Sequence, residues 1–228
     1  MSGDARLIIV AGSDTTAATL TYMMYHLAKD PSIVTKLRQE LKEINYCPGS
    51  EAEVRDIQDA KYLNGIINEA LRLHPAVPSG VLRQTPPEGI DIEGTFIPGG
   101  VTISSPLYSM GRRKSLIRPH FQFPTTNICC VVESCFEHAQ EFIPERWGDK
   151  PELVHNKAAW APFGGGVYSC VGKQLALMEL RSVAARTVMQ FDISFAPGED
   201  GSNLLNRTRD VFTLDLAPLN LVFTERTK

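Results

Sequence analysis

Apolar residues recur at helical spacing along four stretches of the chain. Residues 6–29 contain mostly helix formers, and their pattern stops at Asp30-Pro31. Aspartate caps helices and proline suits their first turn, so we expect this dipeptide to end one helix and begin a second, amphipathic one. Two more helices are predicted at about 60–74, where Pro75 stops the pattern, and at about 172–190.

Shorter alternating patterns predict β segments between and after these helices. Ile97-Pro-Gly-Gly-Val101 has the composition of a turn between two strands. Near the C-terminus, apolar and polar residues alternate at 212–216 and again at 219–223, and this pattern predicts a closing hairpin. The expected fold class is therefore mainly α with small β-sheets.

The composition narrows the possible function classes. The 228 residues include 23 lysines and arginines against 26 aspartates and glutamates, a net charge of −3, so no basic nucleic-acid-binding surface is expected. No apolar run reaches the ~18 residues of a membrane-spanning helix, and the first residues lack the order of a signal peptide. The five cysteines are odd in number and lack C-x-x-C spacing, which argues against a disulfide framework or zinc site and favours a reducing compartment.

The stretch most informative about chemistry is Pro162-Phe-Gly-Gly-Gly-Val-Tyr-Ser-Cys170-Val-Gly172. Its consecutive glycines permit close approach of the backbone to a bound group. Cys170 directly precedes a predicted helix N-terminus, whose free N–H groups and dipole favour a thiolate. A metal ligand and a catalytic nucleophile both require such a cysteine, and a small buried apolar residue is the simpler alternative. Phosphate-binding and dinucleotide-binding glycine patterns do not fit the spacing.

A second unusual stretch, Ala11-Gly-Ser-Asp-Thr-Thr16, places a glycine and polar side chains inside the first helical pattern. Such residues weaken a helix locally. The small Ala11 and Gly12 would leave a groove beside the backbone, where Asp14 and Thr15 could pass protons to a ligand. A helix cap is the simpler interpretation of a Ser-Asp-Thr run.

Four motifs stand in order along the chain: Ala11-Gly-x-Asp14-Thr15-Thr16, Glu69-x-x-Arg72 with Leu-His-Pro, Pro144-Glu-Arg146-Trp, and Phe163-x-x-Gly166-x-x-x-Cys170-x-Gly172. Each is weak or moderate alone. As an ordered set they resemble the C-terminal half of a cytochrome P450, a haem-thiolate monooxygenase, and in particular the fungal microsomal members of secondary metabolism. The resemblance covers nearly the whole chain except the region around residues 112–136.

The resemblance implies that Cys170 is the axial thiolate on the haem iron, where it pushes electron density that favours O–O cleavage. The loop would contact the cofactor through Phe163, Gly166 and Gly172. Arg83 would pair with a haem propionate, and otherwise it is a solvated arginine. The family usually has a second such arginine two residues before the cysteine, where this chain has Tyr168, a hydrogen-bond donor without charge. Weaker haem retention is the expected consequence.

The resemblance also implies roles for the other motifs. Asp14 and Thr15 would form the proton-delivery pair beside an oxygen-binding groove at Ala11 and Gly12. An ion-pair cluster would stabilise the fold behind the haem, formed by Glu69, Arg72 and Arg146. The simpler alternative for the Glu-x-x-Arg motif is an exposed i,i+3 pair. Trp147 and Phe163 are expected to be core or haem-packing aromatics.

Two departures concern the extent of the chain. Measured against the family, Met1 falls within the long oxygen-binding helix, so we expect residues 1–228 to form part of one cytochrome P450 domain, without the membrane anchor and much of the substrate pocket. Residues 114–132 are extra. Arg113-Lys114-Ser115 and Val132-Glu133 can be encoded by the sequences of intron ends. We hypothesise that this segment, with Cys129 and Cys130, is a translated intron or an insertion.

The activity that the resemblance implies is NADPH- and O₂-dependent hydroxylation of a small hydrophobic molecule. An NADPH-cytochrome reductase would supply the electrons, because the chain has no flavin or nicotinamide motif. A full-length relative would reside at the endoplasmic reticulum membrane. Two alternatives stay open: a truncated, inactive remnant or gene-model artefact with weak or no haem binding, and a haem-thiolate isomerase or dehydratase, which Asp14-Thr15 disfavours.

Overall fold

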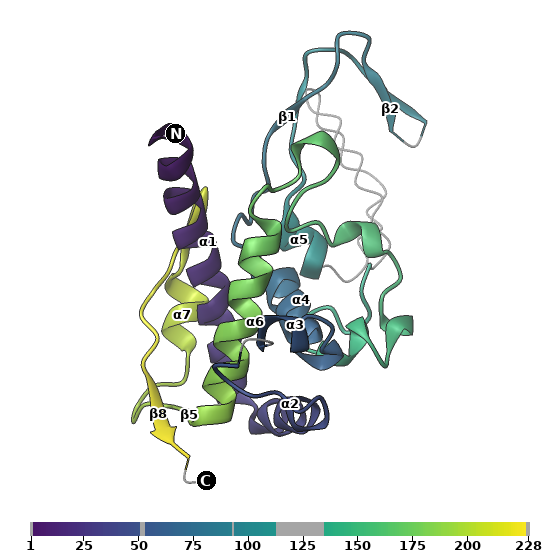
Figure 1. Cartoon of the computed structure of the whole chain (residues 1–228). Coiled ribbons are helices and arrows are strands. Elements are labelled where there is room, and N and C mark those ends of the chain that lie inside the picture. Colours follow the sequence, from purple (N-terminus) through teal and green to yellow (C-terminus); the bar gives the residue numbers. More distant parts are fainter. Residues whose placement is uncertain (1, 51–52, 93, 113–134, 227–228) are drawn as a thin grey trace.

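The computed structural model describes residues 2–50, 53–92, 94–112 and 135–226, and the expected insertion at 114–132 lies outside the described residues. This part of the chain is mainly helical with small sheets, as the sequence predicts (Figure 1). No helix within it combines the length and the apolar character needed to cross a membrane.

Four helices form the main core, and they confirm the helical patterns in the sequence. The long α1 (Ser2–Lys29) lies against α6 (Lys173–Gln190), with α2 (Pro31–Glu43) and α4 (Lys61–Leu73) packed around them (Figure 1). One fully buried residue from each helix contributes to the same apolar cluster: Leu27, Leu37, Ile66 and Ala184. Burial of these stripes is the main source of helix stability here.

The N-terminal third of α1 does not share this burial. Val10 fits the helical pattern but is 66% exposed, and the neighbouring Ile8 and Ile9 are also exposed. In Figure 1 this end of α1 projects beyond the other core helices. The apolar face is therefore present in the sequence, but no described element covers it.

Two of the helix starts are fixed in different ways. Helix α2 begins as predicted, because Asp30 Oδ1 accepts a hydrogen bond from the Ser32 N–H at 2.9 Å. Helix α4 has no local cap, and Glu40 of α2 supplies one. Its carboxylate accepts from the N–H groups of Tyr62 and Leu63 at 2.7 and 2.9 Å. The start of α4 therefore depends on its packing against α2.

Short elements connect the core helices. Three are α-helical, namely α3 (Glu53–Asp56), α5 (Leu107–Arg112) and α7 (Ser202–Arg207). Four are 3₁₀ turns, namely η1 (Pro144–Trp147), η2 (Pro151–Leu153), η3 (Lys157–Ala159) and η4 (Gly166–Tyr168). Of these turns, η1 packs directly on α4 and brings the Pro144-Glu-Arg146-Trp motif to that helix.

The described strands form four antiparallel pairs. They are β1 (Arg83–Gln84) with β4 (Thr102–Ile103), β2 (Ile90–Ile92) with β3 (Thr95–Ile97), β5 (Phe191–Phe195) with β8 (Leu221–Glu225), and β6 (Arg209–Val211) with β7 (Thr213–Asp215). The turn at 97–101 joins β3 to β4 as predicted, although these two strands belong to different sheets.

The predicted closing hairpin is wrong. Strand β7 pairs with β6 across a tight turn at Phe212, whereas β8 pairs with β5, which leaves α6 directly. Alternation identifies the two faces of a strand but not its partner. Pro218 lies between β7 and β8 and interrupts the pattern, so the second alternating run pairs with a strand far away in the sequence.

Candidate functional site

The glycine-rich loop presents Cys170 at the start of α6. Gly164 and Gly166 adopt left-handed φ angles of 67° and 64°, which side chains disfavour. The loop is closed by the Cys170 N–H, which donates to the Phe163 carbonyl at 2.8 Å. The free thiol of Cys170 is exposed. The interpretation of this cysteine as a small buried apolar residue is therefore wrong, and a ligand or nucleophile remains.

The surface around this thiol is apolar. Val167, Tyr168 and Val171 flank it and are exposed at 92%, 73% and 94%. The guanidinium of Arg83, in β1, lies 5.5 Å from the centroid of the Tyr168 ring, a cation–π contact. The structure thus brings together the arginine and the tyrosine that the motifs place near a cofactor carboxylate. Phe163 is only partly buried and packs against the main core cluster.

The Ala11–Thr16 stretch lies in the middle of α1, so its interpretation as a helix cap is wrong. The hydroxyl of Thr15 donates to the Ala11 carbonyl at 2.8 Å, one turn earlier, which leaves its lone pairs able to accept. Asp14 is exposed, and a Cβ on Gly12 would meet nothing within 4 Å. Figure 1 shows this half of α1 at the same end of the molecule as the loop that precedes α6.

Glu69 forms the centre of a buried charge cluster. Its carboxylate, which is inaccessible to solvent, accepts five hydrogen bonds at 2.7–2.9 Å. The donors are Arg72 Nε and Nη2, Arg146 Nε, the Ile143 N–H and the indole Nε1 of Trp147. Glu69 and Arg72 of one motif therefore form ion pairs in the same buried cluster as Arg146 of the other. The alternative of an exposed i,i+3 pair is wrong.

The two arginines of the cluster also bind backbone carbonyls. Arg72 donates to the carbonyls of Gly111, Ala139 and Glu141. Arg146 donates to the Glu137 carbonyl at 2.8 Å. Because the Gly111 carbonyl belongs to α5 and the others lie in irregular chain at 137–141, the cluster fixes α5 and the segment 137–147 onto α4. The sequence did not reveal the hydrogen bond of Trp147, although this residue follows Arg146 directly in the motif.

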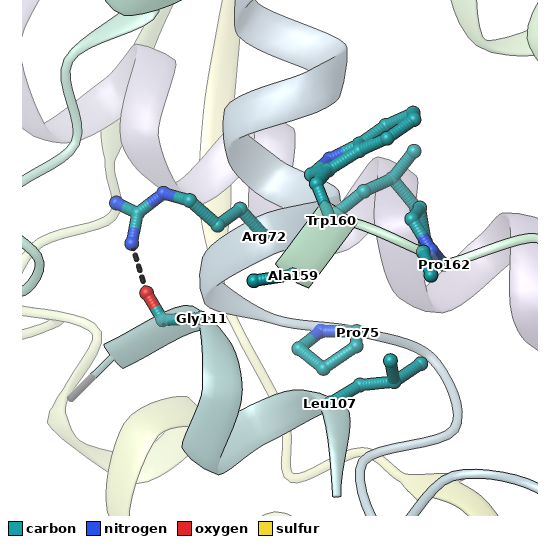
Figure 2. Close-up of a pocket in the computed structure, with 9 residues that line it drawn as sticks. Arg72, Pro75, Leu107, Gly111, Ala159, Trp160 and Pro162 are labelled. Atoms are coloured by element: carbon teal, nitrogen blue, oxygen red, sulfur yellow. Dashed lines mark hydrogen bonds between the residues drawn. The ribbon is translucent and has the colours of Figure 1, made fainter. Parts of the chain in front are cut away.

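A small pocket lies beside this cluster, between the end of α4, α5 and the chain that leads into the thiol loop. Figure 2 shows Pro75, Leu107, Trp160 and Pro162 around it, with the Arg72 side chain directed to the Gly111 carbonyl. The space suits little more than a water molecule. It therefore holds neither a substrate nor a cofactor.

Sequence reasoning also missed a buried histidine pair. His26 of α1 and His74 at the end of α4 have their Nε2 atoms 3.0 Å apart. Arg112 Nη2 lies 3.3 Å from His74 Nδ1, and since a guanidinium only donates, that nitrogen accepts. His74 therefore carries its proton on Nε2, and this N–H donates a hydrogen bond to His26 Nε2. Burial, with smaller effects from nearby cationic groups, lowers the pKa of His26 to about 3 and that of His74 well below 6.5.

The donor chemistry of the site determines which cofactor it can hold. Within the described ranges, no group of three or more histidine, cysteine or acidic side chains could hold a metal ion. Cys170 offers one soft ligand amid exposed apolar side chains. A metal that brings its other ligands in a flat apolar ring, as iron does in haem, fits this single donor.

Comparisons with known proteins point to the same cofactor class. A family model described as cytochrome P450 matches residues 5–118 and 128–222. Cytochrome P450 monooxygenase sthD of Phaeosphaeria nodorum is 43% identical over 224 residues, which are 98% of this chain and 43% of that protein. Tryprostatin B 6-hydroxylase of Aspergillus fumigatus is 41% identical over 226 residues, 99% of this chain and 37% of that protein.

A third relative, cytochrome P450 monooxygenase lcsK of Purpureocillium lilacinum, is 41% identical over 228 residues, 100% of this chain and 38% of that protein. The chain thus spans less than half the length of these fungal relatives. The family match nevertheless covers most of the chain and includes all four sequence motifs. The chain with the exposed Cys170 thiol belongs to the cytochrome P450 family.

Proposed function

We propose that the chain forms the thiolate side of a haem monooxygenase that inserts one oxygen atom from O₂ into a small hydrophobic substrate. The observation that carries the proposal is the exposed Cys170 thiol, which the glycine loop presents next to an apolar surface at the start of α6. Cytochromes P450 are haem proteins that generally use a reductase and hydrophobic substrates, and an NADPH-dependent reductase is the electron donor proposed here.

Haem, when bound, supplies the oxygen activation. The residues of the chain bind the haem and deliver protons beside it. Cys170 provides the iron ligand. Phe163, Gly166 and Gly172 shape the loop around it, and Arg83 with Tyr168 binds a propionate. Ala11 and Gly12 leave room beside α1 for a small ligand. Asp14, which is exposed, would exchange protons with solvent, and together with Thr15 it would form the proton-delivery pair beside this groove.

The residues of the buried cluster have a different role. Glu69, Arg72 and Arg146 contact neither the thiol loop nor the exposed side of α1 in any of their hydrogen bonds. They fix irregular chain onto α4, and Trp160, which follows this chain, lies against Phe163 with ring centroids 6.5 Å apart. The cluster therefore positions the loop of Cys170 and is not itself catalytic.

The proposed activity is tested with haem-loaded protein, an NADPH-dependent reductase and isotope-labelled O₂, with a panel of small hydrophobic compounds. Tryprostatin B is part of the panel because one relative is a tryprostatin B 6-hydroxylase by name. Incorporation of one labelled oxygen is expected. Thr15→Ala should lower the rate by about 10²-fold. Thr21→Ala is the control, because Thr21 makes the same type of backbone hydrogen bond six residues further along α1.

Two results would reject the proposal. Product formation without labelled oxygen would favour an isomerase or dehydratase. No product and no bound haem would favour the inactive remnant.

A further inference from the structure

Trp160 lies where the irregular chain after η3 leads into the thiol loop. Its backbone N–H donates to the Lys157 carbonyl at 3.0 Å, and only two residues separate it from Phe163. Trp160 and Pro162 line the same small pocket (Figure 2). The Trp160 side chain is partly buried and packs against two core clusters, the main one and a smaller one that contains Phe136. Trp160 is therefore held by packing just before the loop begins.

The indole of Trp160 also binds the backbone of α4. Its Nε1–H donates to the Asn68 carbonyl at 3.0 Å, across 92 residues of sequence. Because a carbonyl oxygen has two lone pairs, it can serve the helix with one and accept from the indole with the other. The next residue of α4 is Glu69, whose carboxylate accepts from the indole of Trp147. Two tryptophans are thus bonded to successive residues of one helix, and their ring centroids lie 5.4 Å apart.

The ring of Phe163 connects Trp160 to Cys170. The rings of Trp160 and Phe163 lie edge to face, with centroids 6.5 Å apart and an angle of 68° between their planes. The Phe163 carbonyl accepts from the Cys170 N–H at 2.8 Å. Lys173 Nζ, from the first residue of α6, lies 5.8 Å from the centroid of the Phe163 ring. Phe163 thus contacts Trp160, the amide of the thiol-bearing residue and the helix that follows it.

We infer that Trp160 is a positioning residue that anchors the Cys170 loop to α4 and so keeps the sulfur in place for the iron. The hydrogen bond to the Asn68 carbonyl supplies the anchor, and the contact with the Phe163 ring limits movement of the loop. This inference rests on the proposed function. It goes beyond the role of the Glu69 cluster, because Trp160 bonds α4 through its own donor. A ligand whose supporting contacts are loose is held less firmly at its metal.

The first test is amide hydrogen exchange of the full 228-residue chain, with Trp160→Phe beside Trp147→Phe. Each substitution removes one indole donor and keeps an aromatic ring. Among the described residues, the Trp147 ring contacts Phe136 and Trp160 but not Phe163, so it is the matched control. Trp160→Phe should speed exchange of the Cys170 amide about fivefold, because the residue that carries its acceptor loses an anchored neighbour.

The control should show the opposite pattern. Trp147→Phe removes one of the donors that hold the Glu69 carboxylate, which also accepts from the Ile143 N–H at 2.9 Å. Exchange of the Ile143 amide should therefore speed in Trp147→Phe, whereas the Cys170 amide should keep its wild-type rate. Trp160→Phe should leave the Ile143 amide unchanged. Faster exchange at both amides in Trp160→Phe, as a general loss of folding would give, or an unchanged Cys170 amide would overturn the inference.

A spectrum of the haem-loaded protein tests the consequence at the iron. In the ferrous carbon-monoxide difference spectrum, Trp160→Phe should shift a larger share of the protein to the band that lacks a thiolate ligand, and Trp147→Phe should give the wild-type share. Equal shares in all three proteins would overturn the positioning role. Wild-type protein that binds no haem would reject the proposed function, whereas exchange of the Cys170 amide requires no haem and decides separately whether Trp160 anchors the loop.

Discussion

The guanidinium of Arg146 and the carboxylate of Glu69 meet at 2.8 Å although 77 residues separate them in the sequence. Neither side chain is accessible to solvent. A buried carboxylate is tolerated only when its charge and lone pairs are all satisfied, and here two arginines, an indole and a backbone N–H do so. The pair thus fixes η1 onto α4.

Removing the charge of Glu69 should therefore destabilise the fold strongly. For Glu69→Gln we expect a loss of about 3–5 kcal/mol in the free energy of unfolding, because two buried arginines lose their counter-charge. Trp147→Phe should cost about 1 kcal/mol, since it removes one donor and keeps the aromatic packing. Urea unfolding followed by circular dichroism measures both values.

The control for this series is Glu141→Gln. The Glu141 side chain is exposed and contacts the exposed His138, and only its backbone carbonyl binds Arg72. A change within about 0.5 kcal/mol is expected. Equal losses in Glu69→Gln and Glu141→Gln would contradict the assignment of the cluster.

The histidine pair predicts how stability depends on pH. The folded pKa of His26 is about 3 against 6.5 for a free histidine, and that of His74 is also lowered by burial. As the pH falls below 6.5, these histidines bind protons in the unfolded chain but stay uncharged in the folded chain. The contribution of the uncharged histidine pair to the free energy of unfolding is therefore complete above pH 6.5 and is lost as the pH falls towards 3.

His26→Gln removes one of these titrations and keeps a hydrogen-bond acceptor for His74. The slope of unfolding free energy against pH in the acidic range should decrease by about 1.4 kcal/mol per pH unit. His138→Gln is the control, because His138 is exposed. If both variants show the wild-type slope, the pair accepts protons in the folded protein and the tautomer assignment is wrong.

The remote cap of α4 gives a further prediction. Glu40→Gln should lower the free energy of unfolding by about 1 kcal/mol, because the N–H groups of Tyr62 and Leu63 lose a charged acceptor. The control, Glu43→Gln, changes an exposed carboxylate of α2 that binds Gln39. Thermal unfolding measures the midpoint temperature of both variants, and Glu40→Gln should have the lower one. Equal midpoints would show that the Glu40 carboxylate does not stabilise the start of α4.

Local features of the fold could be predicted from the sequence. The helix boundary at Asp30-Pro31 and the end of α4 before Pro75 follow from capping and proline geometry within a few residues. The apolar stripes of the core helices follow from their spacing. The family resemblance, carried by four short motifs, was confirmed by the comparisons.

Features that depend on distant residues could not be predicted. The pairing of β8 with β5, the cap supplied by Glu40 and the contact of His26 with His74 each join elements that no local pattern connects. The same holds for Trp147, whose apolar ring suggested packing while its N–H binds Glu69. Val10 matches the apolar pattern of a helix but is exposed. Helical spacing of apolar residues predicts a buried face only where another element packs against it.

Whether the spliced transcript encodes residues 114–132 can be tested directly. The family match is interrupted between residues 118 and 128, inside this segment. We propose that the segment is a translated intron or an insertion. Sequencing of spliced RNA should show a message without it, and its presence in every mature transcript would contradict the intron hypothesis.

The central claim is that Cys170 is the iron ligand of a haem site, and a ferrous carbon-monoxide difference spectrum tests it most directly. The haem-reconstituted chain is measured beside Cys170→Ala and Cys47→Ala, the latter an exposed cysteine outside the site. We predict the red-shifted Soret band of a thiolate ligand in the wild type and in Cys47→Ala, and its loss in Cys170→Ala. The same band in Cys170→Ala, or no band in any of the three proteins, would contradict the account.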